Sequence, residues 1–115
     1  MNVFEALFLM VFLHCLGDFA LQSESMAKGK NRHNKCTFVP EGQKFKKCWP
    51  YWLLSHAFIQ GGLIYIFTGN LIISLTEVLL HFVIDFIKCE NITNPHHDQV
   101  FHLFCRITYT VLLVI

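Results

Sequence analysis

The chain has 115 residues, of which 54% are hydrophobic and only 15% are charged, and its formal net charge at pH 7 is +1. A soluble domain usually carries about 25% charged residues, and a small one must solvate a large share of its surface, so this composition argues against a soluble globule. It also excludes a disordered chain, which would be poor in apolar residues. We therefore expect one integral membrane domain spanning residues 1–115.

The first apolar segment covers residues 3–22 and is interrupted by Glu5, His14 and Asp18. It lacks the basic start and the cleavage site of a signal peptide, so we expect it to remain as a helix. Further apolar segments predict helices at residues 51–67, 71–87 and 98–115. Each is close to the length that crosses a bilayer.

A tight break at Thr68-Gly69-Asn70 predicts that the second and third helices form a hairpin. The in-and-out alternation of membrane strands is missing from the sequence, and helices are the other structure that can span a bilayer. The predicted fold is therefore all-α: a polytopic membrane protein with about four transmembrane helices in a compact bundle.

A basic loop, residues 25–49, separates the first two helices. It holds seven of the nine Lys and Arg residues: Lys28, Lys30, Arg32, Lys35, Lys44, Lys46 and Lys47. The positive-inside tendency places such a loop in the cytoplasm, which puts the turn at 89–97 on the same side and both termini outside. Anionic membrane lipids are its expected partners, and nucleic acid is not.

Ionisable residues recur inside these apolar helices, where they are costly and usually functional. His and Asp share a helix face at i, i+4 spacing in three helices, and His56 lies in the remaining helix. With the topology above, all these side chains lie in the cytoplasmic half of the membrane. The set is His14, Asp18, His56, His81, Asp85, Asp98 and His102. Glu77 and Arg106 are predicted to form one further layer, in which they lie at similar depth on facing helices and pair with each other.

Imidazoles and carboxylates converging inside a helical bundle are typical of a metal site. We expect His14, His56, His81, Asp85 and His102 to bind a divalent cation, with zinc as the first candidate and iron or manganese as alternatives. Seven candidate ligands exceed one tetrahedral shell, so two ions also fit. A metal lowers the pKa of a bound water, and Asp18 or Asp98 would then serve as the general base. The predicted activity is hydrolysis of an amphiphilic ester, phosphoester or amide.

Two other interpretations stay open. The same residues suit a proton or metal relay. Four helices are few for a transporter, so the chain would have to form a homo-oligomer. It also lacks the internal repeats typical of transporters. Alternatively, they form a structural network in a membrane protein that acts through interactions alone. Interhelical hydrogen bonds contribute only about 0.6 kcal/mol each in membranes. This stabilisation is small beside the cost of burying seven ionisable groups.

The five cysteines are odd in number and irregularly spaced, so they do not describe a disulfide framework. A reducing cytoplasm would keep Cys36, Cys48 and Cys89 as thiols. His33, Cys36 and Cys48 could supply three ligands to a zinc ion in the loop, but no fourth ligand is evident.

Four motifs in order carry a resemblance to a known family: HCLGDFALQ at 14–22, LSHA at 54–57, HFVID at 81–85 and DQVFH at 98–102. The chain resembles the bacterial and phage membrane family called domain of unknown function 3307. This resemblance implies a small multi-pass protein of a bacterial inner membrane, or of the inner membrane of a phage-infected host. Its His/Asp arrangement is also similar to that of inner-membrane proteins described as metal-dependent hydrolases.

Overall fold

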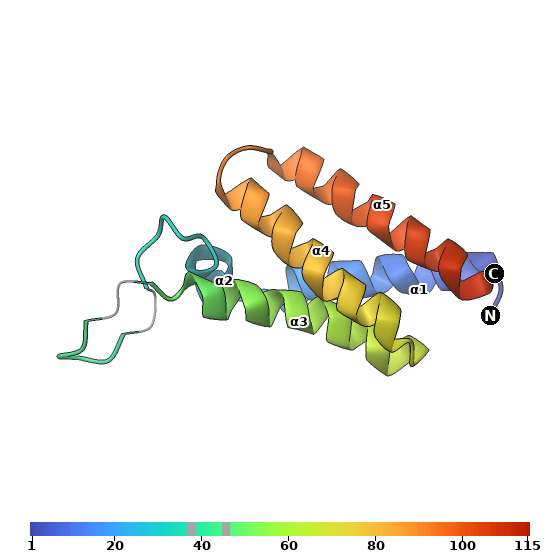
Figure 1. Ribbon diagram of the computed structural model, residues 1–115, viewed down its shortest axis with the longest axis horizontal. Helices are drawn as coiled ribbons and strands as arrows, with labels where there is room; N and C mark the ends of the chain where they lie inside the picture. Colours follow the sequence, from blue (N-terminus) through green and yellow to red (C-terminus); the bar gives the residue numbers. More distant parts are fainter. Residues whose placement is uncertain (37–38, 45–46) are drawn as a thin grey trace.

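The computed structural model describes residues 1–36, 39–44 and 47–115. Four long helices lie along one axis (Figure 1), and no strand occurs within these ranges, so the all-α prediction is confirmed. The helical elements are α1 (Val3–Cys15), the π-helical turn η1 (Leu16–Ala20), α2 (Glu24–Gly29), α3 (Trp49–Thr68), α4 (Leu71–Cys89) and α5 (Pro95–Val114).

The first helix begins at a capping box. The Glu5 amide donates to Asn2 Oδ1 at 2.9 Å, and the Asn2 amide donates to Glu5 Oε2 at 3.0 Å, which satisfies two free amides of the first turn. At its other end α1 continues into η1, and the helical stretch ends at Ala20, two residues before the predicted 22. A π-helical turn places an extra residue in the helix and is frequent at functional sites. Here it carries Asp18.

The predicted hairpin joins α3 to α4. Gly69 adopts the left-handed conformation (φ 68°) that ends α3, and the Asn70 side chain caps α4 by accepting from the Ile73 amide at 3.0 Å. The two helices are very close at Gly61, because a Cβ placed there would lie 2.6 Å from the Ser74 carbonyl oxygen. This glycine therefore sets the spacing of α3 and α4.

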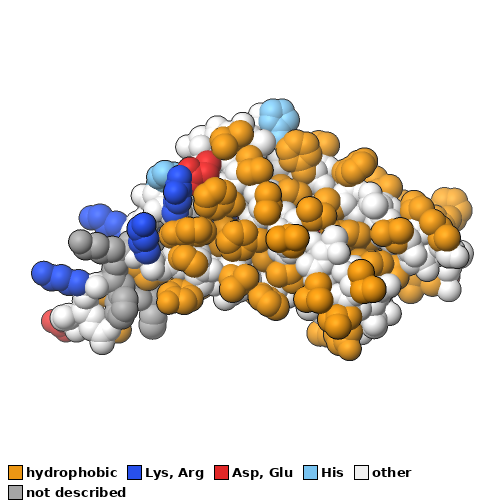
Figure 2. Space-filling model, viewed as in Figure 1, with side chains coloured by type: hydrophobic (Ala, Val, Ile, Leu, Met, Phe, Trp, Pro, Cys, Tyr) orange, Lys and Arg blue, Asp and Glu red, His pale blue; other side chains and the backbone are white. Residues whose placement is uncertain are grey.

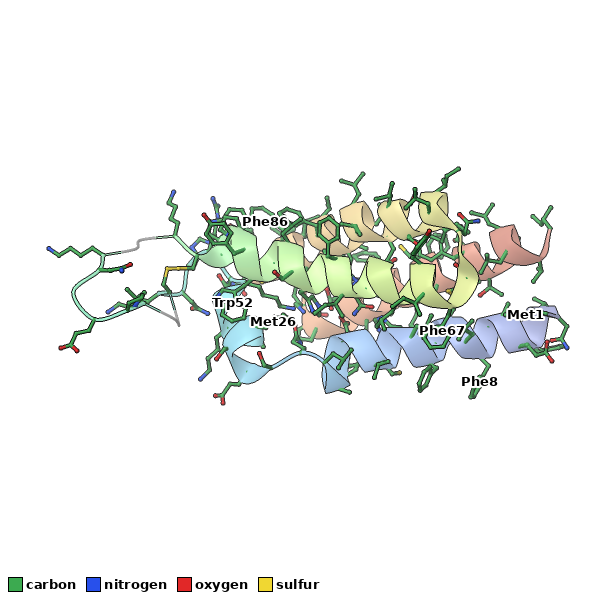
Figure 3. The ribbon with its side chains drawn as sticks, turned by 90° about the horizontal axis from the view of Figure 1, so that it is seen from below. Met1, Phe8, Met26, Trp52, Phe67 and Phe86 are labelled. Atoms are coloured by element: carbon green, nitrogen blue, oxygen red, sulfur yellow. A yellow bond between two sulfur atoms is a disulfide. The ribbon has the colours of Figure 1, made fainter. Side chains whose placement is uncertain are left out.

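The loop prediction for residues 25–49 is wrong at its start, where the chain forms α2. Ser23 caps this helix by accepting from the Met26 amide at 3.1 Å, a local signal for a helix start. Gly29 lies directly against the Trp52 ring, and Figure 3 shows α2 beside the first turns of α3. The contact fixes the position of the next residue, Lys30.

The expectation of thiols in the loop is wrong for Cys36 and Cys48, which form a disulfide with their Cα atoms 5.2 Å apart (Figure 3). Gly42, at φ 80°, provides a left-handed turn that lets the loop fold back. The bond uses both sulfurs, so the zinc site with His33 is also wrong; His33 Nε2 instead lies 3.0 Å from Glu90 Oε2. Lys46 of the basic loop lies outside the described residues.

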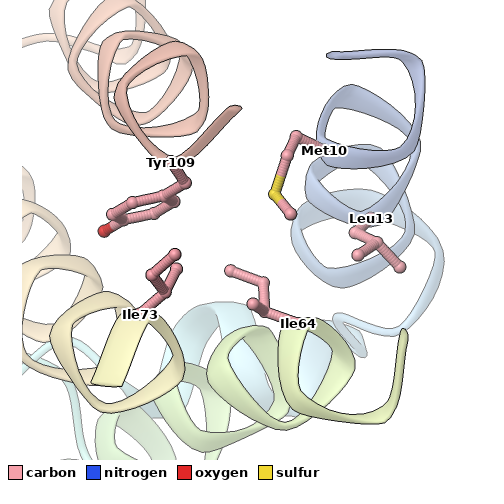
Figure 4. Close-up of a cluster of buried hydrophobic side chains, with 5 residues drawn as sticks. All are labelled: Met10, Leu13, Ile64, Ile73 and Tyr109. Atoms are coloured by element: carbon pink, nitrogen blue, oxygen red, sulfur yellow. The ribbon is translucent and has the colours of Figure 1, made fainter. Parts of the chain in front are cut away.

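Polarity is inverted relative to a soluble protein. The buried polar and charged side chains outnumber the buried apolar ones, while large apolar side chains cover the helical body (Figure 2). Within the described residues one helical stretch, Val3–Ala20, passes a test of length and apolar composition for crossing a membrane. The apolar part of the interior is a small cluster near the end where the termini lie, formed by Met10, Leu13, Ile64, Ile73 and Tyr109 (Figure 4).

Candidate metal centre

All seven residues predicted for the site are buried in one network, and none exposes more than 5% of its surface. α1 and η1 supply two of them, α3 one, α4 two and α5 two. In chain order they are His14, Asp18, His56, His81, Asp85, Asp98 and His102. Helices that are distant in sequence therefore bring the predicted side chains together.

Four ligand atoms converge at the centre of this network. His56 Nε2, His81 Nε2 and Asp18 Oδ1 form a triangle with sides of 3.0, 3.1 and 3.1 Å. Asp85 Oδ2 lies 3.3 Å from His56 Nε2 and 3.6 Å from His81 Nε2. A tetrahedral zinc site with bonds of about 2.0–2.1 Å has ligand atoms about 3.3 Å apart. The five distances thus match the spacing of a zinc coordination shell, and we call these four atoms the tetrahedral set.

The orientation of His81 is fixed by contacts at Nδ1, the ring nitrogen that does not belong to the tetrahedral set. Its Nδ1 lies 3.1 Å from Glu77 Oε1, and Arg106 Nη2 donates to the same oxygen at 3.3 Å. The predicted Glu77–Arg106 pair is therefore confirmed. A carboxylate accepting the Nδ1 proton leaves Nε2 as a lone pair, which is the usual arrangement behind a metal-bound histidine. In that tautomer the lone pair faces two carboxylate oxygens and His56 Nε2, an arrangement in which these atoms could hold a cation.

A second group of ligand atoms adjoins the first. His102 Nε2 lies 3.0 Å from Asp85 Oδ1 and 3.2 Å from Asp98 Oδ1. The two oxygens of Asp85 therefore face different histidines: Oδ2 faces the tetrahedral set and Oδ1 faces His102. Ligand atoms within 4.8 Å of one another occur in this second group and in three members of the tetrahedral set, His56, His81 and Asp85.

His14 has a different position. Its Nε2 lies 2.8 Å from Gln99 Oε1 and 3.6 Å from Asp18 Oδ2, and Gln99 Nε2 donates to Asp18 Oδ2 at 3.0 Å. Within the described ranges, none of the three ligand clusters includes His14. The structure thus places this predicted ligand beside the centre, where it contacts Asp18 directly and through Gln99.

Two lysines enter the site that the sequence interpretation did not assign to it. Lys30 is only 4% exposed, and its Nζ donates to Asp85 Oδ2 at 2.7 Å and to Gln22 Oε1 at 2.6 Å. Lys88 Nζ donates to Asp98 Oδ2 at 3.3 Å. Lys88 lies three residues after Asp85 on α4, so helical spacing could have identified it. Lys30 looked like any other charge of the basic loop.

The fixed charges nearly balance. Four carboxylates, those of Asp18, Glu77, Asp85 and Asp98, are joined in the network to three cations, Lys30, Lys88 and Arg106. With neutral imidazoles one net negative charge remains. An unbalanced charge is costly away from water, and one further positive charge, either a proton on a histidine or a bound cation, would balance the network.

An ion-pair cluster outside the helices holds the segment after Lys30. Arg32 and His33 both contact the Glu90 carboxylate, which follows the last residue of α4. Hydrogen bonds from these two side chains lower the pKa of Glu90 to about 2. The cluster therefore fastens this segment to the end of α4.

We expect acid to weaken this attachment. A lowered pKa in the folded protein means that the Glu90 charge stabilises the fold above its ordinary pKa of 4.5, and that this contribution is lost as the pH falls towards 2. The midpoint of thermal unfolding should therefore be higher for the natural protein than for Glu90→Gln at about pH 6, and the difference should shrink towards about pH 3. A difference independent of pH would contradict this assignment.

One family of known proteins matches this chain over nearly its whole length. A family model described as "Protein of unknown function (DUF3307)" matches residues 6–115, a range that includes all four motifs and all seven predicted site residues. The resemblance inferred from those motifs is confirmed. No curated protein and no solved structure matches the chain.

Proposed function

The chain belongs to the DUF3307 family of proteins of unknown function, and we propose that it is a polytopic membrane protein that binds a divalent cation inside its helical bundle. The proposed activity is metal-dependent hydrolysis of an amphiphilic ester or phosphoester. The proposed location is a bacterial inner membrane or that of a phage-infected host.

The membrane assignment is supported by the inverted polarity. Side chains such as Phe4, Phe8, Ile66, Ile72 and Phe104 are at least two-thirds exposed on the helical body. Water would oppose so large an apolar surface, whereas the hydrocarbon core of a bilayer covers it without cost. The basic side chains gather at one end of the molecule (Figure 2), as expected where helices leave a membrane.

The spacing of the tetrahedral set is the observation that carries the metal proposal. The five distances that join its two imidazole nitrogens to each other and to the two carboxylate oxygens lie between 3.0 and 3.6 Å. Asp18 Oδ1 also accepts from Gln60, and Asp85 Oδ2 also accepts from Lys30. A cation among the four atoms would be bound by all of them, and two imidazoles with two carboxylates suit zinc first.

The hydrolytic activity is supported by what lies beside the cation. Asp98 Oδ1 is buried and has no hydrogen-bond partner among the described residues, so it is free to accept a proton. A divalent cation would supply Lewis acidity and a lowered water pKa, and Asp98 would hold the proton that is released. The apolar cluster of Figure 4 lies on the side of the site that leads to the two termini, which favours a site open to one side over a continuous conducting path.

Metal analysis of the protein purified in detergent tests the proposal. We expect at least one zinc ion per chain after dialysis against zinc, and loss of at least one bound ion in His81→Ala. His96→Ala is the matched control, because His96 is an exposed histidine on the first turn of α5. A natural protein that is folded by circular dichroism and binds no metal would refute the proposal.

A further inference from the structure

We propose that the centre holds two divalent cations bridged by Asp85, and that the second cation recognises a phosphate ester. This inference rests on the proposed function, because the first cation is the one in the tetrahedral set. The second would be bound by Asp85 Oδ1, Asp98 Oδ1 and His102 Nε2. Asp98 is then a ligand in the two-cation centre, and Asp18, the other candidate base, would accept the proton.

The hydrogen bonds around His102 leave a ligand atom free. Its Nε2 lies near two carboxylate oxygens, Asp85 Oδ1 at 3.0 Å and Asp98 Oδ1 at 3.2 Å, yet one N–H can donate well to only one of them. The hydrogen bond goes to Asp85, and within the part of the chain that the structure describes Asp98 Oδ1 has no partner, although the residue is only 1% exposed. An orphaned carboxylate oxygen is costly when buried. A cation between these three atoms would satisfy all of them.

Asp85 is the natural bridge between the two positions. It is fully buried, and each of its oxygens points to a different set of ligands: Oδ2 to His56 and His81, Oδ1 to His102. Paired metal ions in hydrolytic enzymes are about 3.5–4 Å apart and clamp both the attacking and the leaving oxygen. A single carboxylate that joins both ligand groups is suited to hold ions at that separation.

The second position has only three protein ligands, whereas the first has four. Catalytic zinc sites typically have three protein ligands and leave one coordination position for water or substrate. A cavity of about 410 Å³ lies at the turn between α4 and α5, and Lys88 is the residue in its lining that also contacts a ligand of this position. Lys88 connects the two, since its Nζ contacts Asp98 Oδ2 and the side chain is 25% exposed. A ligand in the cavity would therefore approach the second cation.

Charge selects the chemical class of that ligand. The buried network has one net negative charge when its histidines are neutral, from four carboxylates and three cations. Two divalent cations would change this to three net positive charges, and Lys88 adds to the positive character of the cavity. A dianionic phosphate ester would offset most of that charge, whereas a neutral carboxylic ester would offset none of it. The centre therefore favours a phosphoester.

Metal stoichiometry tests the inference independently of catalysis. We expect two zinc ions per chain in the natural protein, one in His102→Gln and one in Asp98→Asn, with two retained in the exposed control variant His96→Ala. One ion in the natural protein, lost on His81→Ala but unaffected by His102→Gln, would overturn the second site and leave the first intact. Absence of any metal would overturn both. The natural protein alone gives the decisive count, so a variant that misfolds does not obscure the result.

Inorganic phosphate is the probe for the ligand class. By calorimetry of the zinc-loaded protein in detergent, we expect phosphate to bind at least tenfold more tightly to the natural protein than to His102→Gln. Equal phosphate affinity in the two proteins would overturn the assignment of the ligand to the second cation.

Discussion

Asp85→Asn should be the most damaging conservative substitution in the bundle. The amide has the shape of the carboxylate but not its charge, so the buried Lys30 ammonium loses the anion 2.7 Å away and the bridge between the two cation positions is lost. Breaking a buried ion pair by removing one partner costs about 3–5 kcal/mol. We expect a large fall in the thermal unfolding midpoint in detergent, together with loss of both zinc ions.

Glu24→Gln is the matched control for this prediction. It makes the same change of carboxylate to amide in an exposed pair, where Lys28 Nζ lies 2.7 Å from Glu24 Oε1 and both side chains are more than 60% exposed. Exposed pairs contribute at most about 1 kcal/mol, so stability and metal content should stay close to those of the natural protein. An Asp85→Asn protein that retains both ions would refute the bridging role.

Gly61→Ala is expected to separate α3 from α4. The added Cβ would lie 2.6 Å from the Ser74 carbonyl oxygen, which is backbone and cannot rotate away. Small residues allow membrane helices to approach this closely, and overpacking costs about 1–3 kcal/mol. Since His56 and His81 lie on these two helices, we also expect weaker zinc binding.

The neighbouring glycine provides the control. A Cβ at Gly62 meets nothing within 4 Å, and alanine is a better helix former by about 1 kcal/mol. Gly62→Ala should therefore match or exceed the natural protein in thermal stability and bind zinc equally well. Equal behaviour of the two alanine variants would show that the close helix contact does not control the centre.

Much of the centre could be predicted from spacing alone. His81 and Asp85 share a helix face because they are four residues apart, and the same holds for Asp98 and His102. The depth of each pair followed from assumed helix directions, and the structure indeed brings these residues together. The Glu77–Arg106 contact followed from the same geometry. Helical periodicity is therefore sufficient to find ligands that project from long helices.

Residues whose positions depend on irregular backbone could not be found in this way. Lys30 reaches Asp85 because a short helix after Ser23 packs Gly29 against Trp52, a tertiary contact with no periodic signal. The π-helical turn at Asp18 changes the register that a regular helix would give. Likewise, only atomic positions show that one oxygen of Asp85 faces His56 and His81 while the other faces His102.

The disulfide in the basic loop has a consequence for how the protein obtains its metal. Such bonds persist in oxidising compartments, while the cytosol keeps thiols reduced, yet the basic residues of the same loop predict the cytoplasmic side. Alkylation of Cys36 and Cys48 in intact cells, before and after reduction, distinguishes the two sides. Because the structure joins these two cysteines, we expect alkylation only after reduction. The centre would then be loaded with metal from an oxidising compartment, and its ligands would arrive from that side.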